Sequence, residues 1–237
     1  NTTSGMSCAL SPDGQRLAVS SANAGAAAAQ ASGWASNALW IQPVSGARAQ
    51  EILLEKTDFI ITDWSPDGKV LLGWSQRNAT SFDVTYVRLD EEDHQVHDLL
   101  NTRFLEFMAR FSPDGAWVAY QSNESGQMEV YVTDFPDATR KWQVSRDGGD
   151  SPAWSPDGRE IYFKKSGNLM AAPVTRRGDG IEIGPPLELG HSETPFWGPY
   201  GSDGKRFLVM QFDPAGTSVE PIQVIRNWPA LLARQAR

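Results

Sequence analysis

The tetrapeptide Ser65-Pro66-Asp67-Gly68 decides the fold class of this chain, because it is one of four identical copies. The other copies begin at Ser11, Ser112 and Ser155, and a degenerate fifth copy is Gly201-Ser202-Asp203-Gly204. Successive aspartates of the five copies are separated by 54, 47, 43 and 46 residues. A repeat with a period in the forties is typical of a β-propeller, in which each repeat forms one four-stranded blade.

Each copy has the chemistry of a hairpin turn. Proline presets φ for the second position of a tight turn, aspartate can accept a hydrogen bond from the backbone two residues on, and glycine tolerates a positive φ. A large apolar residue precedes each turn, and an apolar run follows it, as in Val70-Leu71-Leu72 after the second copy. A short apolar run without alternation predicts a strand that is buried on both faces.

Two further strands follow in most repeats, the fourth being more polar, as expected of an outer edge strand. We therefore predict an all-β fold, namely a β-propeller of five four-stranded antiparallel blades in a single domain, 1–237. A sixth blade would require sequence upstream of Asn1. The predicted blades cover 7–55, 56–103, 104–147, 148–191 and 192–228, and 229–237 is predicted to form a short C-terminal helix that begins with proline.

The composition of the chain argues against nucleic-acid binding and membrane insertion. The chain has 237 residues, 40% of them hydrophobic, and a formal net charge of −8, which argues against nucleic acid as a partner. No run of 18 apolar residues is present, so no membrane insertion is expected from this segment. The single cysteine, Cys8, is expected to be buried on the first inner strand. Without an initiator methionine or a signal peptide, the chain is expected to be part of a longer precursor or a larger assembly.

Catalytic motifs are missing from the sequence. It has no Gly-x-Ser-x-Gly elbow, no phosphate-binding Gly-x-x-x-x-Gly-Lys loop, no His-Glu-x-x-His motif and no Cys-x-x-Cys pair. The acidic stretch 90–98, which contains His94 and His97, is interpreted as a solvated turn rather than a metal site. No cofactor, metal or catalytic residue is therefore predicted.

The repeats also resemble a known family. The pattern Trp-Ser-Pro-Asp-Gly-Lys/Arg, together with stretches such as 122–126, 141–145, 167–171 and 222–228, is similar to the TolB-type, WD40-like propeller repeat over essentially the whole chain. It resembles the C-terminal propeller of bacterial membrane-anchored Ser/Thr kinase-type proteins, although no kinase motif is present. The resemblance implies a non-enzymatic module that is periplasmic or extracellular and binds a protein or a small ligand.

The predicted binding surface consists of the loops that precede the inner strand of each blade, which we call the leading loops. They lie at the end of the strands opposite the tight turns. The predicted binding residues are Phe59, Arg103, Phe104, Glu106, Asp150, His191 and Trp197. Aromatic residues and arginine are typical of protein-binding hot spots. Phe59, Phe107 and Phe196 can alternatively close the core between blades.

An enzymatic function is the alternative that the sequence leaves open. A propeller-type enzyme, or the propeller of one, such as a polysaccharide lyase, a glycosidase or a peptidase-associated domain, would need carboxylates or histidines that converge on the central channel. Asp63, Glu106, Asp150 and His191 all fall near the starts of inner strands.

Overall fold

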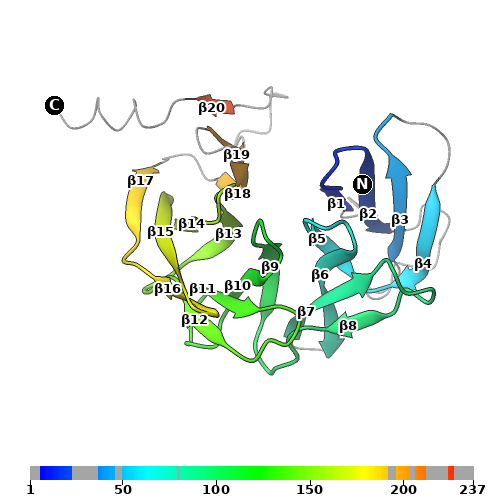
Figure 1. The fold of residues 1–237 in the computed structure, drawn as a ribbon, viewed down its shortest axis with the longest axis horizontal. Coiled ribbons are helices and arrows are strands. Elements are labelled where there is room, and N and C mark those ends of the chain that lie inside the picture. Colours follow the sequence, from blue (N-terminus) through cyan, green and yellow to red (C-terminus); the bar gives the residue numbers. More distant parts are fainter. Residues whose placement is uncertain are drawn as a thin grey trace. The chain divides into compact units, whose positions relative to one another are not determined.

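The computed structural model describes residues 6–22, 37–45, 50–78, 81–191, 196–202, 206–211 and 224–226. These residues form twenty strands and no helix, which confirms the predicted all-β propeller-type fold (Figure 1). The chain divides into two compact units, one with residues 1–111 and 135–138 and one with residues 112–134 and 139–237. The predicted helix at 229–237 lies outside the described residues.

The first unit contains two four-stranded antiparallel sheets. The first sheet has the order β1-β2-β3-β4, with β1 Met6–Leu10, β2 Arg16–Ala22, β3 Asn37–Pro43 and β4 Glu51–Thr57. The second has the order β5-β6-β7-β8, with β5 Ile60–Trp64, β6 Val70–Asn78, β7 Ser81–Arg88 and β8 Val96–Asp98. The unit also contains β9, Glu106–Phe111. Each sheet is a meander of consecutive strands, as the repeat predicts.

In the second unit, β10 Trp117–Ser122 pairs with β11 Glu129–Asp134, which pairs with β12 Lys141–Gln143. The next sheet contains β13 Asp150–Trp154, β14 Glu160–Lys165, β15 Asn168–Arg177, β16 Gly180–Ile183 and β17 Leu187–His191. The last has the order β18-β19-β20, with β18 Phe196–Ser202, β19 Arg206–Gln211 and β20 Val224–Arg226.

The four Ser-Pro-Asp-Gly copies share one turn geometry. In the second copy, Gly68 N–H donates to Ser65 O at 2.9 Å, and Ser65 Oγ donates to Asp67 Oδ1 at 2.6 Å. The same hydroxyl accepts from Val70 N–H at 2.9 Å, at the start of the next strand. Ser11, Ser112 and Ser155 make the corresponding bonds. The repeat therefore specifies a hairpin locally, through its own side chains.

Each unit has its own apolar core. In the first, Phe59, Ile61, Leu71 and Val87 are among the buried residues that pack together between the first two sheets. In the second, the largest buried cluster is formed by residues of β10, β11, β14 and β15 with neighbours such as Trp154. The predicted apolar runs after the turns supply these cores: Leu71, Val118 and Ile161 are fully buried.

Two details differ from the sequence-based expectations. Cys8 is exposed, because its neighbour Ala9 faces the core and successive strand residues point to opposite faces. The outer edge of the fourth sheet is built by two strands rather than one: β16 pairs with the C-terminal half of the long β15, and β17 pairs with its N-terminal half.

Candidate binding surface

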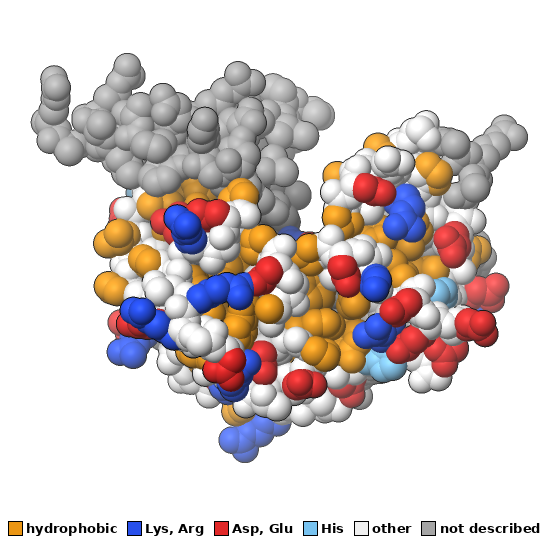
Figure 2. Space-filling model, in the orientation of Figure 1, with side chains coloured by type: hydrophobic (Ala, Val, Ile, Leu, Met, Phe, Trp, Pro, Cys, Tyr) orange, Lys and Arg blue, Asp and Glu red, His pale blue; other side chains and the backbone are white. Residues whose placement is uncertain are grey.

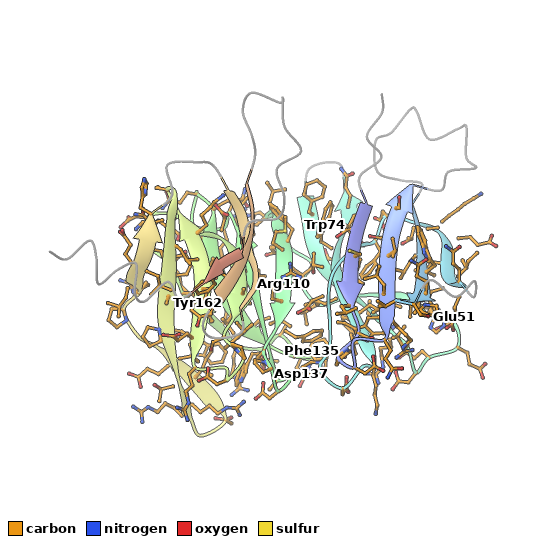
Figure 3. The ribbon with its side chains drawn as sticks, turned by 90° about the horizontal axis from the view of Figure 1, so that it is seen from above. Glu51, Trp74, Arg110, Phe135, Asp137 and Tyr162 are labelled. Atoms are coloured by element: carbon orange, nitrogen blue, oxygen red, sulfur yellow. The ribbon has the colours of Figure 1, made fainter. Side chains whose placement is uncertain are left out.

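The leading loops of the first unit lie at the end of the strands away from the tight turns. On β5 and β6, Trp64 pairs with Leu71 beside the 65–68 turn, whereas Ile60 pairs with Trp74 at the far end. Figure 3 shows Trp74 at the opposite end of the strands from Phe135. The ring of Phe135 contacts that of Phe111, the residue before the 112–115 turn, with 5.0 Å between centroids. The turn end and the loop end of this unit are therefore distinct surfaces.

Three half-buried aromatic rings gather at the loop end. The ring centroids of Trp74 on β6 and Phe82 on β7 are 4.7 Å apart. Phe107, near the start of β9, lies 6.1 Å from Phe82 and 6.4 Å from Trp74, with edge-on geometry in both cases. We call Trp74, Phe82 and Phe107 the aromatic cluster. Aromatic pairs at such separations attract one another beyond their buried area, so the cluster is a pre-formed apolar platform.

The leading loop of β9, which runs into Phe107 of this cluster, carries an arginine. Arg103 is exposed, and its guanidinium lies 5.0 Å from the ring centroid of Phe104. The loop is held by Thr102, whose backbone N–H donates to Asp83 at 3.0 Å and whose hydroxyl donates to Glu106 Oε1 at 2.9 Å. Asp83 and Glu106 are both buried, and these partly buried bonds to them fix the conformation of the loop.

Two predicted binding residues of this unit are therefore structural. Phe59 is fully buried in the core, and Glu106 is 1% exposed beneath the loop that it holds. Neither side chain is available to a partner on this surface. Of the predicted residues in this loop, Arg103 is exposed and Phe104 is half-buried, three residues before Phe107. Sequence reasoning missed Trp74 and Phe82 as surface residues, because both lie within strand patterns that indicate burial.

A buried carboxylate also anchors the leading loop of β13 in the second unit. Glu129 accepts hydrogen bonds from the hydroxyl of Ser145 and from Gly148 N–H, the latter at 2.8 Å. Asp150, a predicted binding residue, is half-buried at the start of β13, where it pairs with Lys164 at 3.2 Å. Its charge is thereby partly neutralised within its own sheet.

The last two predicted binding residues belong to the end of the fourth sheet and the start of the fifth. His191 is exposed at the end of β17, on an edge strand rather than in a loop, and contacts Asn168 through Nδ1. Trp197 and Phe196 lie on β18, and their side chains lie outside the described residues.

The acidic stretch 90–98 forms the β7–β8 hairpin. Figure 2 shows carboxylates gathered beside the histidine side chains of this hairpin. Arg88 pairs with Asp90 at 2.8 Å and with Glu91 at 3.2 Å, and His97 contacts Glu91 at 2.8 Å while stacking on Tyr86. Within the described residues, no group of three or more His, Cys, Asp or Glu side chains is arranged to hold a metal ion. Asp90 and Glu91 are thus paired within the hairpin, whereas Asp93 and Asp98 accept from the neutral amides of Gln95 and Asn101.

No helix in the described part of the chain is long and apolar enough to cross a membrane.

No protein-family model matches the sequence, and no curated protein matches it. Solved structures do resemble the fold. A protein from Agrobacterium tumefaciens described as TolB is 22% identical, with a TM-score of 0.61, over 87% of this chain and 74% of that one. TolB from Acinetobacter baumannii is 20% identical, with a TM-score of 0.58, over 90% of this chain and 53% of that one. This chain thus spans about half the length of the second structure.

A peptidase is also similar in fold. Prolyl oligopeptidase B from Galerina marginata is 13% identical, with a TM-score of 0.54, over 88% of this chain and 31% of that one. The chain therefore has a TolB-like β-propeller fold, and that fold occurs both in TolB proteins and as part of a peptidase.

Proposed function

We propose that this chain is a non-enzymatic protein-interaction module of the bacterial cell envelope, which acts outside the cytoplasm and binds its partner at the loop end of the first unit. The observation that carries the proposal is the aromatic cluster, together with the exposed Arg103 over the half-buried Phe104 in the loop that leads into Phe107. The likeness to TolB structures supports the class of protein.

The composition of this surface is that of a binding hot spot. Trp and Arg are enriched among residues whose truncation costs more than about 2 kcal/mol of binding free energy, and such residues gather at the centre of an interface. The rings of the cluster hold one another in place, and Thr102 fixes the loop that carries Arg103. Little conformational entropy is then lost on binding, which favours affinity.

Substitution of the surface residues tests the proposal. We expect Arg103→Glu and Phe104→Ala to reduce recovery of the partner from a bacterial envelope extract, measured by crosslinking and mass spectrometry. Arg159→Glu is the matched control, because Arg159 is an exposed arginine of the 155–158 turn region, 83% accessible. Equal recovery by all three variants and the unaltered chain contradicts this placement of the binding surface.

A propeller that forms part of an enzyme is the second candidate, favoured by the likeness to a prolyl oligopeptidase. Turnover of peptide, ester or polysaccharide substrates by the purified chain distinguishes the two functions. We expect none. Turnover that is lost on substitution of Asp150 or His191 would support the enzyme instead.

A further inference from the structure

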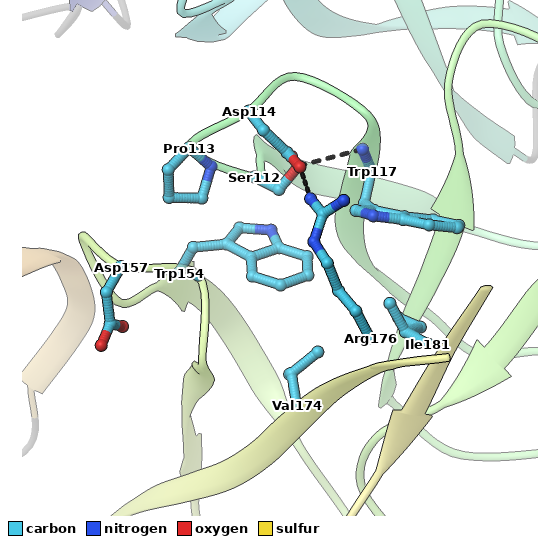
Figure 4. A pocket seen from close by; sticks show the side chains of 10 residues that line it. Ser112, Pro113, Asp114, Trp117, Trp154, Asp157, Val174, Arg176 and Ile181 are labelled. Atoms are coloured by element: carbon cyan, nitrogen blue, oxygen red, sulfur yellow. Dashed lines mark hydrogen bonds and ion pairs between the residues drawn. The ribbon is translucent and has the colours of Figure 1, made fainter. Parts of the chain in front are cut away.

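A cavity of about 110 Å³ lies within the second unit, beside the 112–115 turn (Figure 4). Its walls come from two neighbouring turns and from the β15–β16 hairpin. It is lined by Ser112, Pro113, Asp114, Trp117, Trp154, Asp157, Gly158, Val174, Arg176 and Ile181. A site that holds one water needs roughly 10–15 Å³ by this measure, so the cavity has room for a ligand of several non-hydrogen atoms.

One wall of the cavity carries a polar group without a partner. Trp117 is only 6% exposed, and its indole Nε1–H makes no hydrogen bond. Figure 4 shows the nitrogen edge of this indole on the side of Arg176, toward the cavity. Buried N–H groups nearly always have a partner, because an unpaired donor loses its hydration without compensation. An acceptor on a ligand in the cavity would supply the partner that Trp117 Nε1–H lacks within the protein.

The position of Trp117 is fixed by its surroundings. Its backbone N–H donates to Ser112 Oγ at 3.0 Å, within the turn. Its ring meets that of Trp142 edge-on at 5.1 Å, and the Arg140 guanidinium lies 5.2 Å from its centroid. The indole N–H cannot turn away to find another partner without breaking these contacts.

The lining of the cavity carries charged groups of both signs, namely two carboxylates and one guanidinium. Arg176 forms an ion pair with Asp114, and Asp157 lies on the opposite turn. An anion would be opposed by the two carboxylates, and a cation would be opposed by Arg176 and by the indole N–H, which carries a partial positive charge. An uncharged ligand that both accepts and donates hydrogen bonds satisfies both kinds of group.

We propose that this cavity binds an uncharged polyol, through a hydroxyl that accepts from Trp117 Nε1–H and donates to Asp114. Hydroxyl groups combine one donor with two acceptor positions, which is what this mixed lining requires. The apolar walls formed by Val174, Ile181 and Pro113 suit the carbon skeleton of such a molecule. A free small polyol and a saccharide unit share this chemistry. The inference is independent of protein binding at the aromatic cluster, which belongs to the other unit.

Titration of the Trp117 indole resonance tests the proposal. We expect glycerol, glucose or maltotetraose to shift the ¹H–¹⁵N signal of Trp117 Nε1–H in a saturable manner. The signal is assigned to Trp117 because it disappears in the Trp117→Phe variant. Glycerol as the tightest probe identifies a free polyol, and maltotetraose as the tightest identifies a saccharide unit. No saturable shift with any of the three overturns the proposal, as does a tighter response to acetate or guanidinium.

Matched substitutions separate the cavity from the turn. Asp114→Asn is expected to weaken polyol binding by about tenfold, the loss of one charge-assisted hydrogen bond. Asp67→Asn alters the equivalent turn in the first unit, where Ser65 and Asp67 make the same hydrogen bond. This variant is expected to leave the midpoint of the polyol titration unchanged. Equal weakening by both, or by neither, overturns the assignment.

Discussion

Asp63 on β5 accepts a hydrogen bond of 2.8 Å from the backbone N–H of Phe111, the last residue of β9. Its other oxygen accepts from Trp64 N–H at 2.9 Å, and Arg110 lies close enough to interact with its charge. One carboxylate thus ties two inner strands that are 48 residues apart in sequence. Burial raises the pKa of Asp63 above its usual range, while Arg110 and the two backbone bonds oppose the shift.

The first prediction concerns pH. The pKa of Asp63 is raised in the folded state, so the folded protein keeps this proton to higher pH than the unfolded chain does. Between the pKa of Asp63 in the unfolded chain and its pKa in the folded protein, the free energy of unfolding therefore falls as pH rises. Asp63→Asn removes this pH dependence. It also leaves one of the two backbone N–H donors facing the side-chain NH2 group of asparagine, which lowers the free energy of unfolding by about 1–3 kcal/mol. Urea unfolding from pH 4 to 7 should show that the difference in free energy of unfolding between the unaltered protein and the variant shrinks as pH rises. Parallel curves would contradict the assignment.

The second prediction concerns the turn hydroxyls. Ser65→Ala removes the donor to Asp67 and leaves the N–H of Val70, a buried residue, without its partner. We expect a loss of about 1–3 kcal/mol in the free energy of unfolding. Ser125→Ala, at an exposed position in the 123–126 turn, is the control and should change stability by less than about 0.5 kcal/mol. Thermal and urea unfolding measure both.

The third prediction is the acid response of the same turn. The hydroxyl of Ser65, followed by the backbone N–H of Lys69, lowers the pKa of Asp67 against the opposing effect of burial. Its contribution to stability is therefore present above the unfolded pKa of about 3.9 and lost as pH falls through the folded value. The destabilisation caused by Ser65→Ala should be larger at pH 5 than at pH 2.5. A difference that is independent of pH would show that Asp67 is not involved.

The fourth prediction contrasts two glycines. A Cβ at Gly73 would lie 2.3 Å from the carbonyl oxygen of Ile60 and 2.7 Å from the ring of Phe59, so the backbone or the core must move. We expect Gly73→Ala to cost about 3 kcal/mol or more by overpacking. Gly126 has a φ of +95° but open space around its Cβ position, so Gly126→Ala should cost only about 1–2 kcal/mol of backbone strain. The order of the two losses, measured by urea unfolding, is the test.

The fifth prediction separates core from surface among the residues first assigned to binding. Phe59→Ala should destabilise the protein by about 3–5 kcal/mol, because the ring is fully buried. Arg103→Ala should change the free energy of unfolding by less than about 0.5 kcal/mol, since its side chain is exposed. A soluble, stable Phe59→Ala variant would show that this ring is not part of the core.

The predicted turns were correct in detail because a turn is a local structure. Serine, aspartate and glycine within four residues supply its hydrogen bonds and its positive φ, and Gly14, Gly68, Gly115 and Gly158 all have φ near +70°. The strands that flank the turns follow from their apolar runs for the same reason. The outer edge of the fourth sheet was predicted less well, because the pairing of β17 with β15 depends on contacts between distant residues.

The sequence by itself determined the repeat, the turns, the all-β class and the resemblance to TolB-type propellers, since these depend on residues that are near one another in the chain. Only the tertiary structure decided which side chains reach the surface. Phe59 and Glu106 share the composition of a binding loop but are buried by neighbouring strands, whereas Trp74, Phe82 and Phe107 meet at one end of three different strands. The cavity beside Trp117 likewise requires two turns 43 residues apart to lie side by side, and no local pattern encodes that packing.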